Sequence, residues 1–309
     1  MTLCRAALTS TRSLEANDRS TAARIAVGTT VRCDTAGVRF VDQLRSFRRR
    51  RIAIPVGADD LVLDVGSGDK PHWRADVLLD RYIDAAHAGQ RSGRRAARVS
   101  RPLFDADAAA MPFADRAFDY SVCSHVLEHV IDPGAVIDEL VRVSKAGYIE
   151  VPEASSAKIL DFPSHLWWVR LDGDTLVFTA KAARYHDAEI DAYIRRAGIE
   201  QRLADLLDAD FDHRIVALRW VGSVRYRIEG KVPQSLIEYA AEAGGHQRVG
   251  QTIAARAMTA VMTLPLRRIR HRAPILHDDV VDVAHRTGTG ETLHRQVYRR
   301  TTPPPELSA

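Results

Sequence analysis

The chain has 309 residues, of which 46% are hydrophobic and 27% charged, and its formal net charge is +4. This composition is that of an ordinary globular protein, and the length suits one large domain with an appendage or two small domains. The net charge is too small to argue for nucleic-acid binding by itself. The cysteines Cys4, Cys33 and Cys123 form no CxxC pair, which argues against a disulfide framework or a cysteine zinc site and for a reducing compartment.

The two ends of the chain differ in composition from its middle. Residues 1–35 are rich in Ser, Thr, Ala and Arg without a clear period, which predicts a flexible N-terminal extension. They lack the apolar core of a signal peptide, and no segment is long and apolar enough to span a bilayer, so we expect a cytoplasmic protein. Residues 231–309 predict a helical, basic accessory segment that ends in a disordered, proline-rich tail.

The first periodic segment runs from Val38 to Ile54. Its apolar residues are spaced three apart, which predicts a helix. This segment carries four consecutive arginines, Arg48 to Arg51. Such a run favours a solvated face over a site for an anionic partner.

The stretch from Leu61 to Gly68 reads LVLDVGSG, and the rest of the chain is arranged around it. An apolar run that ends in glycines predicts a buried parallel strand followed by a tight turn that a ligand can approach. A dinucleotide fold would require a third glycine at position 71, which is Pro71. A turn that binds S-adenosylmethionine (SAM) requires only the first glycines, and Asp64 in front of them suits a cationic ligand.

Further strands are predicted along the chain at Ala75–Leu79, Leu103–Asp107, Phe118–Cys123 and Tyr148–Val151. Because Asp80 follows Gly68 so closely, the first crossover should hold a very short helix or none. Asp132 and Pro133 predict the start of a helix that runs to about Lys145. A hairpin is expected around Asp172–Asp174, a helix over residues 188–197, and a closing pair of strands over 211–229.

These elements predict an α/β protein. Its centre is a doubly wound, mostly parallel seven-stranded sheet with helices on both faces, followed by a helical C-terminal extension. The domain at this centre should span residues 36–230.

Two phrases identify a family by resemblance. They are D-A-x-x-x-P-F-x-D-x-x-F-D-Y, starting at Asp107, and H-V-L-E-H-V-x-D-P, starting at His125. Together with LVLDVGSG and GYIEVP, in this order and spacing, they closely resemble class I SAM-dependent methyltransferases. The resemblance is to the type 11 branch, which includes small-molecule enzymes of ubiquinone biosynthesis. It is strong from Ile52 to Pro152.

The resemblance implies SAM as cofactor and assigns a role to each matching position. Gly66, Ser67 and Gly68 would pass under the amino acid part of SAM, and Asp64 would help to hold its ammonium group. Ser124 and His125 would face the methionyl portion and the methyl group.

The adenosine half of SAM would lie along the neighbouring strands. Asp80 would bind the ribose, Asp107 would accept a hydrogen bond from the adenine amine, and Ala108 would lie against the ring. The shortened first crossover departs from the family pattern at Asp80, and Arg81 and Asp84 lie close to it in the sequence.

The acceptor side is less specific in sequence. Residues 155–180 follow the fifth strand and should form a flap over the acceptor site, with Asp161 and His165 as the most reachable bases. His125 is the third candidate for a catalytic residue.

His125, Glu128 and His129 are spaced i, i+3, i+4, so a helical turn places all three on one face. Some relatives bind a divalent metal through Glu, Glu and His at these positions, and imidazole suits a transition metal. The alternative is that Glu128 and His129 brace the following helix while His125 lines the SAM pocket. The alternative is favoured, so no metal is expected.

The leading functional hypothesis is a SAM-dependent methyltransferase that acts on a small-molecule or glycan-like acceptor, at oxygen. An RNA methyltransferase is a second hypothesis, motivated by Arg48–Arg51 and the arginines of residues 91–101. No recognised RNA-binding module supports it, so nucleic acid is not the expected partner. A SAM-fold binding protein without turnover is a third hypothesis.

Residues 252–272 combine a moderately apolar helix with a cluster of arginines. This pattern suits a weak, peripheral contact with an anionic membrane surface. The alternative, slightly favoured, is a helix packed on the α/β core with a solvated basic end. The sequence does not identify the acceptor or predict an oligomeric state.

Overall fold

The structure is a computed structural model, and it describes residues 35–84, 96–196, 198–199, 202–203, 206–207, 211–242, 257–266 and 273–299. The predicted N-terminal extension, apart from Thr35, and the proline-rich tail lie outside these residues. So do most of the basic residues 91–101 and the basic end of the segment 252–272.

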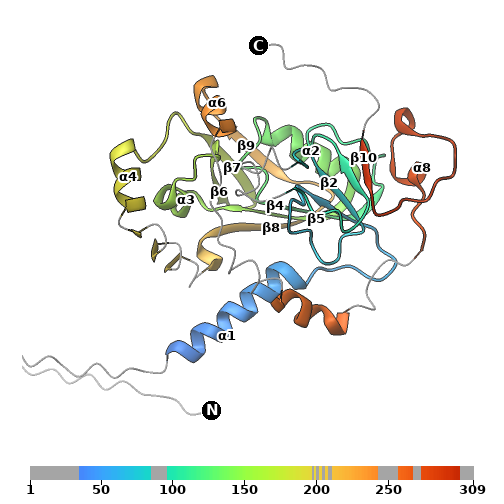
Figure 1. Cartoon of the computed structure of the whole chain (residues 1–309), viewed down its shortest axis with the longest axis horizontal. Helices are drawn as coiled ribbons and strands as arrows, with labels where there is room; N and C mark the ends of the chain where they lie inside the picture. Colours follow the sequence, from blue (N-terminus) through green and yellow to red (C-terminus); the bar gives the residue numbers. More distant parts are fainter. Residues whose placement is uncertain are drawn as a thin grey trace, which may run out of the picture.

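A seven-stranded sheet forms the centre of the fold, as predicted (Figure 1). The strand order is β10-β3-β2-β1-β4-β5-β8, and all neighbours are parallel except β8, which runs antiparallel to β5. The strands are β1 (Val62–Val65), β2 (Val77–Asp80), β3 (Leu103–Asp105), β4 (Phe118–Ser124), β5 (Ser144–Pro152), β8 (Ile215–Val221) and β10 (Val297–Arg299).

The central strand β1 is buried along its whole length. Leu63 and Val65 pack into the main apolar core, whereas Val62 packs on the opposite face with Tyr120 and Val122. Alternation of side chains along a strand explains how one short apolar run serves both faces. Because β1 lies between β2 and β4, its carboxyl end opens at the middle of the sheet edge.

The connections around β1 also follow the sequence. No helix is present between Gly66 and Asp76, so the first crossover is an irregular turn, as expected. Helix α2 (Pro133–Val143) begins where predicted, because the Asp132 carboxylate accepts a hydrogen bond from the Ala135 amide at 3.0 Å. It ends two residues before Lys145, since Ser144 already pairs with Phe118 in the sheet.

A second, three-stranded sheet lies beside the first. The predicted hairpin is present as β6 (Trp167–Asp172) and β7 (Thr175–Ala180), paired antiparallel. The expected closing pair of the main sheet is split, because β8 joins β5 while β9 (Arg225–Glu229) pairs in parallel with β7. The Glu229 carboxylate accepts hydrogen bonds from Arg170 and Thr179, which holds β9 on the hairpin.

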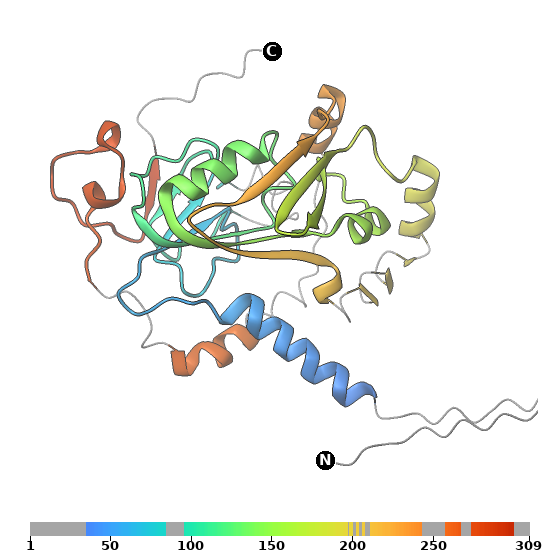
Figure 2. The ribbon, with the colours of Figure 1, turned by 180° about the vertical axis from the view of Figure 1, so that it is seen from behind.

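The remaining helices surround the two sheets (Figures 1 and 2). Their bounds are α1 (Thr35–Phe47), the π-helix η1 (Arg48–Ile52), α3 (Ala154–Leu160), α4 (Ala188–Arg196), η3 (Phe211–His213), α6 (Gln234–Glu242), η4 (Leu264–Leu266), α8 (His277–Val280) and η5 (Val283–His285). A further helix spans residues 257–263. No helix among the described residues is long and apolar enough to cross a membrane.

The C-terminal part of the chain differs from the expected helical accessory segment. Strand β10 pairs in parallel with β3 and forms the edge of the main sheet (red in Figure 1). Before it, Val280 and Val281 are at most 1% exposed within the main core, and Val281 forms an isolated bridge with Phe113. The short apolar runs here lack a helical period, so their burial follows from tertiary packing that the sequence pattern does not carry.

Residues 257–266 lie beside the end of α1 in both views of the ribbon (Figures 1 and 2). In this stretch Thr263 is buried, whereas Val261 and Leu264 are 72% and 59% exposed. A contact of this helix with a membrane surface remains a prediction.

The burial of Val281 predicts a matched pair of substitutions. Val281→Ala should lower the free energy of unfolding by about 2 kcal/mol, because two buried methyl groups are removed and a cavity is left. Val283→Ala should change it by less than about 0.5 kcal/mol, since Val283 is 78% exposed. Urea denaturation of the full chain measures both. Equal effects would mean that this segment does not pack on the core.

Candidate active site

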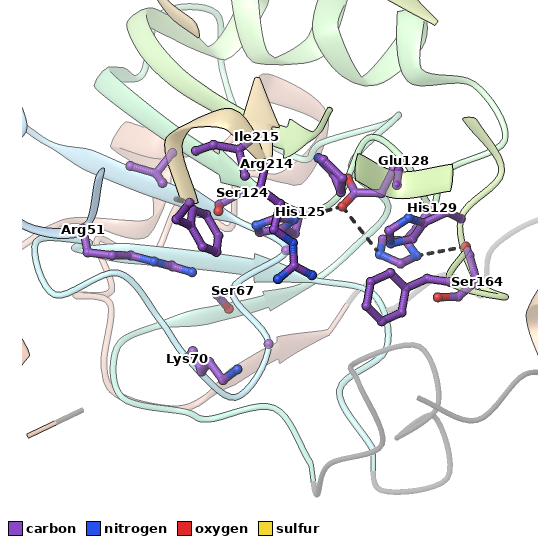
Figure 3. Close-up of a pocket in the computed structure, with 18 of the residues that line it drawn as sticks. Arg51, Ser67, Lys70, Ser124, His125, Glu128, His129, Ser164, Arg214 and Ile215 are labelled. Atoms are coloured by element: carbon purple, nitrogen blue, oxygen red, sulfur yellow. Dashed lines mark hydrogen bonds and ion pairs between the residues drawn. The ribbon is translucent and has the colours of Figure 1, made fainter. Parts of the chain in front are cut away.

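A cavity of about 390 Å³ opens at the carboxyl ends of β1, β4 and β5 (Figure 3). Three segments supply most of its wall: the glycine turn after β1, the turn after β4, and residues 156–165 at and after α3. This is the edge of a parallel sheet at which ligands bind. Of the expected cofactor residues, Asp64, Gly66, Ser67, Gly68 and Ser124 line the cavity.

The glycine turn has the geometry that its sequence predicts. Gly66 and Gly68 have φ angles of +68° and +51°, a region that favours glycine. A Cβ atom on Gly66 would lie 2.2 Å from Cγ2 of Val126, so no side chain fits there. The Ser67 hydroxyl between them is buried and has no hydrogen-bond partner among the described residues.

Asp64, the last polar side chain before the turn, is 5% exposed. Its carboxylate accepts a hydrogen bond from the His72 amide at 2.7 Å. Burial raises the pKa of Asp64 to about 7, which outweighs this hydrogen bond and the positive charge of Arg51. Burial also lowers the pKa of His72, another cavity residue, to about 3, so its ring is neutral at pH 7.

The three residues expected at the adenosine half lie outside this cavity, at the ends of β2 and β3. The Asp80 carboxylate accepts hydrogen bonds from the amides of Gly68 at 2.8 Å and Tyr82 at 2.9 Å, so it also holds the glycine turn. Asp107 accepts from the Ala109 amide and from Arg81, whose guanidinium lies 2.6 Å away. Ala108 is 8% exposed and packs into the core.

Glu150 of β5 is the centre of a buried polar network that the sequence did not reveal. Its two oxygens accept hydrogen bonds at 2.9 Å from Nε and Nη2 of Arg50. Tyr148 and Ser124 donate to the same carboxylate at 2.5 and 3.2 Å. Burial alone would raise the pKa of Glu150, but the hydrogen bond from His125 and the charges of Arg51 and Arg50 hold it well below its usual range.

His125 lies between two buried carboxylates. Its Nδ1 is 3.2 Å from Oε1 of Glu128, and its Nε2 is 3.2 Å from Oε1 of Glu150. Burial alone would lower its pKa, but the hydrogen bonds to Glu128 and Glu150 raise it to about 9. His125 is therefore a cation at pH 7, with both ring nitrogens engaged. It can stabilise negative charge, but it is not a general base.

His129 and His165 lie on the other side of Glu128. The ring of His129 has Nδ1 3.0 Å from the Ser164 carbonyl oxygen and Nε2 3.8 Å from Oε1 of Glu128 (Figure 3). The His165 ring packs edge-to-face on it with centroids 4.8 Å apart. Burial above all, and the nearby positive charge of Lys181, hold the pKa of His165 well below its usual range, so it is a neutral, weak base.

Asp161 was expected as a base within reach of the acceptor, but its side chain lies away from the cavity. It is 1% exposed and does not line the cavity. Lys181 Nζ and Arg184 Nε each lie 2.7 Å from its carboxylate. Burial alone would raise its pKa, but the hydrogen bonds from Lys181, the His186 amide and Arg184 lower it. A carboxylate neutralised in this way is structural.

The arginine run, expected as a solvated face, is divided between several roles. Arg50 is 9% exposed and pairs with Glu150, Arg49 pairs with Asp212, and Arg51 lines the cavity. A glutamate inside the apolar strand segment GYIEVP was the signal that a buried cation must be close by. Sequence spacing could not show which arginine supplies it.

The charge of His125 predicts a pH dependence of stability. Because its pKa rises from about 6.5 in the unfolded chain to about 9 in the folded protein, its stabilising effect is complete below pH 6.5 and is lost as pH rises to 9. His125→Gln should flatten the fall in unfolding free energy between pH 7 and 9 in urea titrations. His285→Gln, a change outside the cavity, should keep the wild-type slope. Parallel curves for all three proteins would contradict a charged His125.

Comparison with known proteins finds relatives of the central part of the chain. Residues 63–149 match the family described as Methyltransferase domain. A demethylmenaquinone methyltransferase of Paenarthrobacter aurescens is 31% identical over 108 residues, which are 34% of this chain and 43% of that protein. One of Renibacterium salmoninarum is 36% identical over 107 residues, which are 32% of this chain and 44% of that protein. The chain thus spans less than half the length of these curated relatives.

Among solved structures, the YcgJ protein of Bacillus subtilis is 20% identical, with a TM-score of 0.28 over 40% of this chain and 61% of that one. A likeness at this level carries no argument about function. The family match, the sheet order and the glycine turn agree with the resemblance seen in the sequence. Residues 63–149 are therefore a class I, SAM-dependent methyltransferase domain.

Proposed function

We propose that the protein transfers a methyl group from SAM to a small-molecule acceptor, at oxygen. The observation that carries this proposal is the cavity at the glycine turn, which joins the cofactor residues to a polar chamber lined by His125, His129 and His165. Its volume is within the range of small-ligand pockets, which is roughly 300–1,000 Å³.

The residues at the glycine turn fit the amino acid half of SAM. An ionised Asp64 suits the ammonium group, and the buried Ser67 hydroxyl has an unused hydrogen bond to offer a carboxylate. Gly66 and Gly68 both line the cavity, so their backbone borders the space that a ligand would fill. When bound, SAM supplies an activated methyl group on a sulfonium, which leaves by in-line displacement. The protein has to align the acceptor and exclude water.

The cavity wall carries charges of both signs, because the carboxylates Asp64, Asp69 and Glu128 line it together with several cations. Arg51, Lys70, Arg214 and the cationic His125 all line it (Figure 3). An acidic hydroxyl requires less help from a base, which suits a site where His165 is weakly basic. Phe162 and Phe211 in the same wall offer apolar surface for a planar ring. A phenol-like acceptor fits this combination better than the aliphatic hydroxyl of a glycan.

The alternatives have less support. The relatives named demethylmenaquinone methyltransferase suggest a quinone-type acceptor, whose ring is also planar. An RNA acceptor is disfavoured, since Arg49 and Arg50 are paired with acidic side chains and Arg51 faces the cavity. A binding protein without turnover would keep the cofactor residues but has no need of the polar chamber beside them.

Cofactor binding should depend on pH through Asp64. Because the pKa of Asp64 is about 7, its ionised fraction rises about tenfold from pH 6 to pH 8, and SAM affinity should rise by a similar factor. Isothermal titration at both values measures this rise. Asp64→Asn should bind SAM more weakly. The pH dependence that is lost in this variant is the part that the Asp64 carboxylate causes. The wild-type protein should give no signal with NAD. Identical pH profiles for the two proteins would show that Asp64 does not face the ligand.

Turnover can be tested with methyl-labelled SAM and three acceptor panels: phenols and quinols, oligosaccharides, and structured RNA. Mass spectrometry should find the label in the first panel. Label in RNA alone would reverse the choice of acceptor. SAM binding without label transfer to any panel, or to small molecules extracted from cells, would favour the binding-protein alternative.

A further inference from the structure

We infer that Glu128, His129 and His165 form a divalent-metal site in the wall of the cavity. Each of the three offers one ligand atom, and these atoms lie within 4.8 Å of one another. Among the described residues, no other group of three or more acidic, histidine or cysteine side chains meets at this spacing. The set contains His165, which lies 36 residues beyond His129 in the chain. It takes the place of His125 in the triad that the sequence spacing offered as the disfavoured metal alternative.

Two atoms of the cluster are buried without a partner. Oε2 of Glu128 and Nδ1 of His165 have no hydrogen bond within the described part of the chain, and the two residues are 1% and 6% exposed. Leaving a buried polar atom unpaired costs about 1–3 kcal/mol, so two such atoms on residues of one cluster favour a bound species. A cation fits better than an apolar group, because both atoms can act as electron-pair donors.

The third ligand is held in the orientation that metal-binding histidines adopt. His129 Nδ1 donates to the Ser164 carbonyl oxygen, which leaves Nε2 as the donor of an electron pair. That nitrogen faces Oε1 of Glu128 at 3.8 Å. Because His125 already donates to this oxygen, a metal held between His129 and Glu128 would bind through Oε2.

The cluster is built on fixed backbone. The Leu166 amide donates to the Glu128 carbonyl at 2.7 Å, which ties the loop of His165 to the turn of Glu128 and His129. At the other end of this loop, Asp161 is held by Lys181 and Arg184. Such anchoring preorganises ligands from two distant segments.

His125 is not available as a ligand, because its two nitrogens are engaged with Glu128 and Glu150. Its hydrogen bond uses Oε1 of Glu128 and leaves Oε2 for a metal. His125 therefore orients the Glu128 carboxylate as a positioning residue.

Two imidazoles and one carboxylate select the kind of metal. This ligand set suits Zn²⁺, Co²⁺, Fe²⁺ or Mn²⁺, whereas Mg²⁺ prefers oxygen ligands alone. With ligand bonds of about 2.0–2.2 Å, neighbouring ligand atoms of a tetrahedral site lie about 3.4 Å apart. Modest side-chain rotation would bring the cluster to that spacing. Three protein ligands leave a position open, as in catalytic sites.

The consequence for catalysis rests on the proposed function. An acceptor hydroxyl at the open position would lose its proton to solvent more readily beside the metal charge. The oxygen would then form a bond to the methyl carbon as the carbon–sulfur bond of SAM breaks, and the sulfonium would become a thioether. As a metal ligand, His165 would not act as the base, and the metal would activate the hydroxyl in its place.

Metal binding is tested on the full chain without SAM or acceptor, so its outcome is independent of turnover. Metal-free protein should bind one equivalent of Zn²⁺ or Co²⁺ in calorimetry, and bound Co²⁺ should give the visible absorption of a four- or five-coordinate ion. His165→Gln and His129→Gln should each weaken binding by more than about tenfold. The matched control His285→Gln should bind as the wild type does.

The wild type alone provides a second measurement that does not depend on folding of the variants. X-ray absorption of the zinc-loaded protein should detect two imidazole ligands and at least one oxygen. Either of two results would overturn the inference: no stoichiometric binding, or loss of affinity in His125→Gln with none in His165→Gln.

Discussion

The carboxylate of Glu150 is the constraint on which the rest of the site depends. A buried carboxylate is costly unless charges and hydrogen bonds compensate it, and this one receives Arg50, Tyr148, Ser124 and His125. Removing one partner of such a buried pair costs about 3–5 kcal/mol. The pair with Arg50 also joins η1, which precedes the first strand, to β5, the strand between β4 and β8. The Arg50 guanidinium lies 3.7 Å from the ring centroid of Phe211, a residue of the cavity wall.

The same carboxylate decides the chemistry of its neighbours. Because Glu150 and Glu128 hold His125 as a cation, the residue that follows β4 contributes charge and not basicity. Its φ angle of +58° is uncommon for a side chain other than glycine and is held by the hydrogen bond from its amide to the Glu150 carbonyl at 2.8 Å. Oε1 of Glu128 faces both His125 and His129, at 3.2 and 3.8 Å. Its Oε2 has no hydrogen-bond partner among the described residues. The charge of His125 and the orientation of the Glu128 carboxylate thus both depend on Glu150, a buried strand residue.

The fold could be predicted from sequence where a pattern is local. The run Val62–Val65 with its glycines, the absent first helix, the Asp132 cap and the β6–β7 hairpin all follow from residues that are close in the chain. Strands β9 and β10 could not be placed in the same way, because their partners β7 and β3 lie far away in sequence and their own patterns are short. In the site, the glycine turn was predictable, whereas the pairing of Arg50 with Glu150 spans 100 residues.

Asp161 shows why a functional role cannot be assigned from position alone. It follows α3 in the segment that lies closest to the acceptor chamber, and in sequence it looks like a reachable base. Its φ angle of +33° turns the chain sharply, and its carboxylate accepts hydrogen bonds from Lys181, Arg184 and the amides of Tyr185 and His186. These contacts fix the start of the loop that carries Ser164 and His165. Asp161 therefore acts indirectly: it does not line the cavity, but it fixes the loop that places His165 opposite Glu128.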